Sequence, residues 1–208
     1  MTNLNRTPQE DFWAGQFGDA YADRCQGESL IAAKTALFAK VIARAARISS
    51  VTELGTNRGL NLQALSRLVP GIDLAGVEIN RKAWEAVTAW GGADVVNGSL
   101  FEYKPKRTAD LAFTSGVMIH LAPDLLPRAY DQLYAASHRF IAVIEYYNPT
   151  PVTVTYRGVE ERLFKRDFAG EMLDRFTDLR LLDYGFIYHR DENFPMDDIN
   201  WFLMEKKL

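Results

Sequence analysis

The sequence has one cysteine, no excess of basic residues and no long apolar run, and each of these shortages excludes a class of protein. Because Cys25 is alone, the chain can form neither an internal disulfide nor a zinc site made of cysteines. No apolar stretch reaches the roughly 18 residues that a membrane-spanning helix needs. The formal net charge of −3 argues against binding nucleic acid through bulk positive charge, although a local basic groove stays open. We therefore expect no metal centre, no membrane partner and no nucleic-acid partner.

The remaining composition is that of one soluble globular domain. The chain has 208 residues, of which 48% are hydrophobic and 25% are charged. Its first residues, MTNLNRTPQEDFW, contain no apolar segment of the kind found in secretory signals, so we expect a cytoplasmic protein. Repeats and linkers are absent from the sequence, which predicts a single domain over residues 1–208. The sequence does not indicate an oligomeric state.

Apolar strand patterns alternate with helical patterns along most of the chain. Strands are predicted at residues 50–54, 73–79, 93–99, 109–116 and 139–147. Helices are predicted at residues 28–48, 61–69, 81–90 and 125–137. A second helix-and-strand region is predicted after Pro149, with a helix at 167–176 and closing strands at 179–190 and 199–207. This alternation predicts an α/β domain with a mostly parallel sheet, which binds ligands beyond the carboxyl ends of its strands.

A glycine turn follows the first predicted strand. It has the sequence Glu53-Leu-Gly55-Thr-Asn57-Arg-Gly59. A dinucleotide-binding turn would carry glycine at Asn57 and at Leu60 as well. The turn instead resembles the acidic-x-Gly-x-Gly-x-Gly pattern of class I S-adenosylmethionine-dependent methyltransferases. Asparagine takes the middle glycine position here, and it tolerates left-handed backbone angles better than most residues.

Polar residues at the later strand ends extend this resemblance. Glu78 ends the second strand, where a carboxylate can accept both hydroxyls of a ribose. Ser99 follows the third strand and is expected near the adenine amine, and Ser115 and Gly116 follow the fourth strand, near the methionine part. The neighbouring residues that the resemblance also assigns to S-adenosylmethionine are Thr56, Asn61, Ile79 and Leu100. The implied fold is Rossmann-like, with a mostly parallel seven-stranded sheet and helices on both faces.

The first 27 residues are rich in aromatic side chains and are expected to form a lid. Tyr21 and Arg24 are three residues apart, so they share one face of a helix. We expect Arg24 to bind the carboxylate of the cofactor and Tyr21 to cover its methionine chain. The other aromatic residues of this segment, Phe12, Trp13 and Phe17, are expected to pack in the core.

Beyond this class, nearly the whole chain resembles the methylases associated with pseudaminic acid biosynthesis. The resemblance rests on the stretches DFWAGQFGDAYADR, ELGTNRGLNLQAL, GVMIHLAPDLLP, EYYNPTPVTVTYRG, RLFKRDFAGEML and DYGFIYHRDENFPMDDINWFL. It implies methyl transfer to a small-molecule acceptor, a nonulosonic acid sugar or its nucleotide-linked form, on nitrogen or oxygen. It also implies that residues 149–180 form a substrate-side insertion before the closing strands.

Candidate residues for the chemistry lie at the ends of the fourth and fifth strands. His120 is the candidate general base, and a structural histidine bonded to backbone is the equally weighted alternative. Tyr147 is the second catalytic candidate, at the exit of the fifth strand. An acidic sugar would suit arginine, which binds carboxylates and phosphates through two parallel hydrogen bonds. The candidates for substrate binding are Tyr146, Asn148, Arg157, Arg166 and His189.

Other functions stay open at this point. The chain could methylate another small metabolite, or it could be a non-catalytic module that binds the cofactor. A dinucleotide oxidoreductase is disfavoured by the glycine count. A methyltransferase acting on RNA or protein is also disfavoured, because TSGVM stands after the fourth strand where an Asn-Pro-Pro-Tyr signature would be expected.

Overall fold

The computed structural model describes residues 6–156 and 159–207. Its α-helices are α1 (Pro8–Ala14), α2 (Gln16–Arg24), α3 (Glu28–Val41), α4 (Leu60–Leu68), α5 (Arg81–Trp90), α6 (Leu126–Ala136) and α7 (Phe168–Arg175). Its 3-10 helices are η1 (Ile42–Arg44), η2 (Met118–His120) and η3 (Pro123–Leu125). Its strands are β1 (Ser50–Leu54), β2 (Asp73–Glu78), β3 (Asp94–Asn97), β4 (Ala109–Ser115), β5 (Ser137–Glu145), β6 (Val152–Tyr156), β7 (Val159–Lys165), β8 (Leu179–Ile187) and β9 (Ile199–Lys206).

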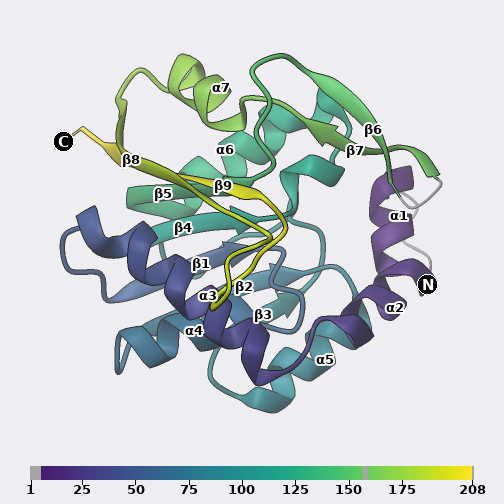
Figure 1. The fold of residues 1–208 in the computed structure, drawn as a ribbon, viewed down its shortest axis with the longest axis horizontal. Coiled ribbons are helices and arrows are strands. Elements are labelled where there is room, and N and C mark those ends of the chain that lie inside the picture. Colours follow the sequence, from purple (N-terminus) through teal and green to yellow (C-terminus); the bar gives the residue numbers. More distant parts are fainter. Residues whose placement is uncertain (1–5, 157–158, 208) are drawn as a thin grey trace.

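Seven strands form one sheet in the order β3-β2-β1-β4-β5-β9-β8 (Figure 1). The first five strands in this order pair in parallel, and β9 then pairs antiparallel with both β5 and β8. The predicted mostly parallel sheet is confirmed. β1 is central, and the order of the strands reverses between β1 and β4. Ligands of open α/β sheets bind at such a switch point, so β1 places the glycine turn where a ligand is expected.

Two apolar clusters cover the two faces of the sheet. One cluster joins α6 and α7 to the sheet, with Leu133 and Phe168 fully buried. The other joins α3 and α4 to the opposite face, with Phe38 and Leu65 fully buried. Helices therefore lie on both faces, as the sequence predicts. Among the helices of the described residues, none is long and apolar enough to cross a membrane.

The helices α1 and α2 do not pack on either face of the sheet but lie at its carboxyl edge, and we call them the N-terminal cover (Figure 1). Thr7 starts α1 with a capping box, because its side chain accepts from Glu10 N while the Glu10 side chain accepts from Thr7 N. The aromatic rings of the cover pack on one another, with 5.3 Å between the ring centroids of Trp13 and Tyr21. The predicted lid, residues 1–27, includes this cover, and its role as a lid stays a prediction.

The segment 149–180 contains two kinds of structure. β6 and β7 pair as a separate antiparallel hairpin, which contacts η2 and extends in the direction of α1 in Figure 1. α7 belongs to the helical layer, because Phe168 and Met172 are buried in the core. The hairpin is therefore the part of the segment that is added to the sheet-and-helix frame.

Candidate functional site

The glycine turn after β1 holds the backbone in a conformation that few residues adopt. Gly55 has φ +84° and Asn57 has φ +48°, so asparagine occupies the left-handed region at the middle position. The amides of Gly55 and Thr56 both donate to Val77 O, at 2.9 and 3.1 Å. A Cβ atom on Gly55 would lie 2.5 Å from the Val117 side chain. The turn is thus pinned to β2 and passes close to the segment after β4.

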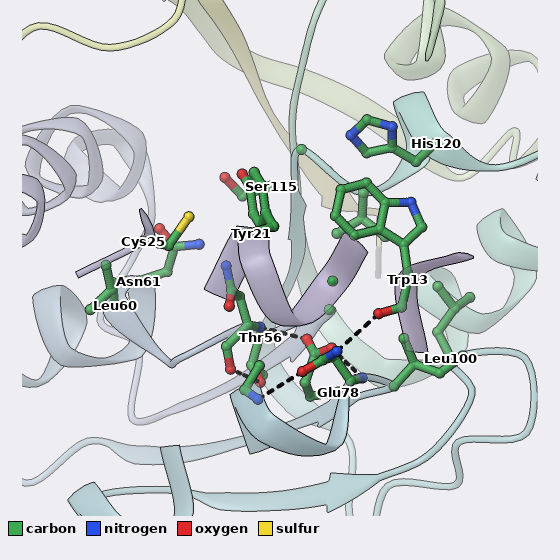
Figure 2. A pocket seen from close by; sticks show the side chains of 18 of the residues that line it. Trp13, Tyr21, Cys25, Thr56, Leu60, Asn61, Glu78, Leu100, Ser115 and His120 are labelled. Atoms are coloured by element: carbon green, nitrogen blue, oxygen red, sulfur yellow. Dashed lines mark hydrogen bonds between the residues drawn. The ribbon is translucent and has the colours of Figure 1, made fainter. Parts of the chain in front are cut away.

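A cavity of about 290 Å³ lies above this turn, at the carboxyl ends of β1, β2 and β4 and below the N-terminal cover. Figure 2 shows that side chains from all these elements surround it. Predicted site residues that line the cavity are Tyr21, Gly55, Thr56, Asn57, Asn61, Glu78, Ile79, Leu100, Ser115, Gly116 and His120. The structure therefore brings together most of the predicted cofactor residues and the candidate base.

Glu53 is buried beneath the cavity and belongs to a chain of polar groups. Asn61 donates from Nδ2 to Glu53 Oε1 at 2.6 Å, and Lys34 Nζ donates to Asn61 Oδ1 at 2.8 Å. Glu53 Oε2 is buried with no hydrogen-bond partner among the described residues. Burial raises the pKa of Glu53 to about 8, against the opposite effects of the Asn61 hydrogen bond and the Lys34 ammonium. An unpartnered buried acceptor of this kind suits a cationic group entering from the cavity.

Glu78 ends β2 at the wall of the cavity. Its Oε2 accepts from Asn57 N at 2.6 Å and its Oε1 accepts from Asn80 N at 2.7 Å. Burial raises the pKa of Glu78, although these backbone hydrogen bonds favour the charged form. A carboxylate has about four lone-pair sites, so acceptor capacity remains for a hydroxyl group of a ligand.

His120 lies at the end of the cavity beneath the cover. It ends η2, and the centroid of its ring lies 4.5 Å from that of Trp13 (Figure 2). The buried carboxylate of Glu145 accepts from the amides of Val117 and Met118, at 3.0 and 3.1 Å. Burial raises the pKa of Glu145 to about 7, while these amides lower it. Glu145 thus fixes the segment that carries His120.

Four predicted cofactor residues do not line the cavity: Glu53, which is buried beneath it, and Gly59, Ser99 and Arg24, each of which has another local role. Gly59 has φ +75° and forms the N-cap of α4. Ser99 Oγ accepts from Phe101 N at 3.1 Å, which closes the turn after β3. Arg24 is exposed at the end of α2, with its guanidinium carbon 5.7 Å from the centroid of the Tyr21 ring.

The predicted catalytic residue Tyr147 and the predicted substrate residues that the structure describes also lie apart from the cavity lining. Tyr147 is 40% exposed, and Asn148 bonds locally to Thr150. Tyr146 is half-buried beneath the Lys165 ammonium. Of the other two described candidates, Arg166 is ion-paired with Glu171, and Nδ1 of His189 lies 2.8 Å from Asp198 Oδ1. Arg157 lies outside the described residues.

Several cavity residues were not predicted from the sequence, and Lys34, Trp13 and Asn80 are the ones with most bearing on the site. Lys34 lies within the apolar stripe of α3. A charged residue among apolar positions was the feature of the sequence that could have identified it as a cavity residue. Trp13 was assigned to the core, yet it lines the cavity. Asn80 lines it as well, and its place before a helical pattern marks it as an N-cap but not as a site residue.

No protein-family model matches this chain, and no curated protein sequence is detectably similar to it. Solved structures do resemble it. The chain matches the 1,6-didemethyltoxoflavin-N1-methyltransferase of Burkholderia thailandensis, crystallised with 1,6-didemethyltoxoflavin and S-adenosylhomocysteine, with a TM-score of 0.72 and 16% identity over 100% of this chain and 94% of that one. It matches the magnesium protoporphyrin IX methyltransferase of Synechocystis, crystallised with S-adenosylmethionine, with a TM-score of 0.71 and 12% identity over 99% and 100%.

A third match is an S-adenosylmethionine-dependent methyltransferase from Clostridium acetobutylicum, with a TM-score of 0.64 and 10% identity over 92% and 98% of the two chains. The chain has the class I methyltransferase fold. Identities this low establish the fold alone, so these similarities do not identify an acceptor. Within this methyltransferase fold, the cavity occupies the switch point of the sheet. No group of three or more His, Cys, Asp or Glu side chains in the described part of the chain is arranged to hold a metal ion.

Proposed function

We propose that the protein is an S-adenosylmethionine-dependent methyltransferase acting on a small molecule. The observation that carries the proposal is the buried, unpartnered Oε2 of Glu53, which lies beneath the cavity on the strand next to that of Glu78, a residue of the cavity lining. The cofactor has an ammonium group, which Glu53 would accept. It also has a ribose, whose hydroxyls Glu78 would accept. Two carboxylates around a glycine turn therefore fit this cofactor.

Glu53 disfavours a dinucleotide, whereas Glu78 fits the ribose of either cofactor. A pyrophosphate is anionic and binds where backbone amides and positive charge meet, whereas the buried carboxylate of Glu53 lies beside this turn. The strand order differs as well, because the dinucleotide fold continues 3-2-1-4-5-6 while β9 here inserts antiparallel between β5 and β8. Both features support methyl transfer over hydride transfer.

Lys34 is the residue that we assign to the cofactor carboxylate, in place of Arg24. It lines the cavity, and its ammonium group donates a hydrogen bond to Asn61, which in turn donates one to Glu53. A zwitterionic amino-acid group needs an anion for its ammonium and a cation for its carboxylate, and the pair Glu53 and Lys34 provides both. The apolar side chains of Ile79 and Leu100 suit the adenine ring.

When bound, the cofactor supplies an activated methyl group, so the protein has to orient the acceptor and exclude water. Trp13 from the cover and His120 from η2 close one end of the cavity. We assign His120 the removal of a proton from a hydroxyl or amine acceptor. Glu145 acts at a distance, by holding the backbone of η2 in place.

For the acceptor we propose a nonulosonic acid sugar or its nucleotide-linked form. The support is the resemblance of the sequence to methylases associated with pseudaminic acid biosynthesis. The guanidinium Nε of Arg166 is paired with the Glu171 carboxylate, so the acid would have to bind the other N–H groups of this guanidinium. This part of the proposal therefore depends on direct tests with acceptors.

Calorimetric titrations with S-adenosylmethionine, S-adenosylhomocysteine and NADH test the proposed function, after any carried-over cofactor has been removed by unfolding and refolding. We expect stoichiometric binding of the first two and none of NADH. Incubation with S-adenosylmethionine and a panel of nonulosonic acids should then give a methylated product by mass spectrometry. Binding of NADH alone would overturn the proposal. Cofactor binding without product from any acceptor would indicate a non-catalytic module.

A further inference from the structure

Asn80 occupies a position between the cofactor site and the N-terminal cover. It lies two residues after Glu78, is buried, and forms the N-cap of α5. Its Oδ1 accepts from Ala83 N at 2.9 Å, as an N-cap side chain should. Because the amide oxygen is committed to the helix, the amide nitrogen has to point the other way.

The amide nitrogen of Asn80 points to the cover. Nδ2 donates to Trp13 O at 3.1 Å and to Asp19 Oδ1 at 2.8 Å. The backbone amide of the same residue donates to Glu78 Oε1 at 2.7 Å. One residue thus bonds to both helices of the cover, through Trp13 and Asp19, and to the carboxylate that we assign to the ribose.

Gly18 shows how closely the cover is seated on this residue. A Cβ atom at Gly18 would collide with Trp13 O and would lie 2.8 Å from Asn80 Nδ2. Glycine is a poorer helix former than alanine, so its presence inside α2 is explained by this close approach.

We propose that Asn80 is a positioning residue that couples occupancy of Glu78 to closure of the N-terminal cover. The proposal rests on the proposed function, since it takes Glu78 to bind the ribose. A ligand hydrogen-bonded to Glu78 fixes that carboxylate, the carboxylate fixes Asn80, and Asn80 holds the cover over Trp13 and His120. By linkage, a seated cover should also strengthen binding of the ligand.

The cover has a second tie that provides a matched control. Lys82 and Asp23 form an ion pair, with 2.7 Å between Nζ and Oδ1 and with side chains 47% and 55% exposed. This pair joins α5 to α2, as Asn80 does, but it does not bond to Glu78. An exposed ion pair contributes little to stability, so removing it should not affect the coupling.

The experiment compares wild type with Asn80→Ser, Gly18→Ala and Lys82→Ala by amide hydrogen exchange over residues 8–24, with and without S-adenosylhomocysteine. Serine keeps the N-cap but has no amide to donate, and alanine at Gly18 disturbs the same contact from the cover side. Without ligand, we expect about tenfold faster exchange in both variants, as the loss of one or two hydrogen bonds implies. With saturating ligand, wild type and Lys82→Ala should gain protection in this segment, whereas Asn80→Ser and Gly18→Ala should not.

Two outcomes would overturn the coupling. One is ligand-induced protection in Asn80→Ser equal to that of wild type. The other is equal behaviour of Asn80→Ser and Lys82→Ala. Failure of wild type to bind S-adenosylhomocysteine in calorimetry would instead overturn the proposed function. In that case the exchange rates without ligand would still decide whether Asn80 holds the cover.

Discussion

Asn61 donates a hydrogen bond to one oxygen of Glu53 at 2.6 Å, and the other oxygen of this carboxylate is buried without a partner among the described residues. Burying an acceptor in this way is costly unless a ligand completes its bonding. Under the proposed function, this half-satisfied carboxylate is where the ammonium group of the cofactor would bind.

Glu53→Gln should weaken binding of S-adenosylhomocysteine about 10- to 100-fold, because a charge-assisted hydrogen bond to its ammonium is lost. The variant should fold, since glutamine is isosteric and neutral in a buried position. Calorimetry measures the affinity, and thermal unfolding checks the fold. Glu28→Gln, an exposed carboxylate on α3 paired with Arg67, is the matched control and should bind like wild type. Equal affinity in Glu53→Gln and wild type would remove Glu53 from the site.

Binding should depend on pH, because burial raises the pKa of Glu53 to about 8 in the unliganded protein. A carboxyl group whose pKa is raised by folding stabilises the folded state fully at pH values below its ordinary pKa of about 4.3. This contribution to the free energy of unfolding is lost as the pH rises toward 8. A bound ammonium favours the ionised carboxylate, so binding should release a proton and the affinity should rise between pH 6 and 8. Calorimetry at pH 7 in two buffers with different ionisation enthalpies counts the protons. Binding to Glu53→Gln should release fewer protons. An unchanged number of released protons would mean that another group loses the proton.

Lys34→Met should weaken binding of S-adenosylhomocysteine about tenfold, with little effect on 5′-methylthioadenosine, which lacks the amino-acid group. Methionine keeps the length of the side chain and removes only its charge. Comparing the two ligands by calorimetry separates loss of the carboxylate contact from a general change in the cavity. Arg24→Met is the control, because Arg24 is exposed and does not line the cavity. The reverse result, with Arg24→Met the weaker binder, would restore the interpretation made from the sequence.

The predicted cofactor residues come together around one cavity for a physical reason. Glu53, Gly55 and Asn57 lie within one strand and its turn, so local backbone geometry fixes their arrangement. Glu78 follows from the topology, since parallel neighbours bring their carboxyl ends to the same edge of the sheet.

The acceptor end could not be predicted in the same way. Tyr147 ends a strand on the correct edge, yet its ring lies 5.9 Å from that of Phe202 instead of facing the cavity. His189 is paired with Asp198. Whether such a side chain faces a ligand depends on contacts that are distant in the sequence, and periodicity does not report them. The place of Trp13 at the cavity also depends on a contact that is distant in the sequence, the hydrogen bond that its backbone carbonyl accepts from Asn80.

Glu78→Ala should weaken binding of S-adenosylhomocysteine and of 5′-methylthioadenosine equally, by about 10- to 100-fold, because both ligands carry the ribose. The equal loss contrasts with the selective loss expected for Lys34→Met. Since Glu78 also accepts from Asn57 N and Asn80 N, part of the loss comes from a loosened turn. Thermal unfolding without ligand measures that part. A loss confined to S-adenosylhomocysteine would mean that Glu78 does not bind the ribose.

His120→Gln separates a catalytic histidine from a structural one. If His120 removes the acceptor proton, the variant should keep its affinity for S-adenosylhomocysteine and lose about 10²- to 10⁴-fold in kcat with the acceptor identified by the panel. Glutamine retains hydrogen-bonding groups and a comparable size, so its contact with the Trp13 ring should be the main structural loss. Trp13→Phe, which changes that contact without removing a base, is the matched variant and should affect KM more than kcat. A kcat for His120→Gln within a few-fold of wild type would mean that the acceptor loses its proton without this histidine, as a neutral amine can.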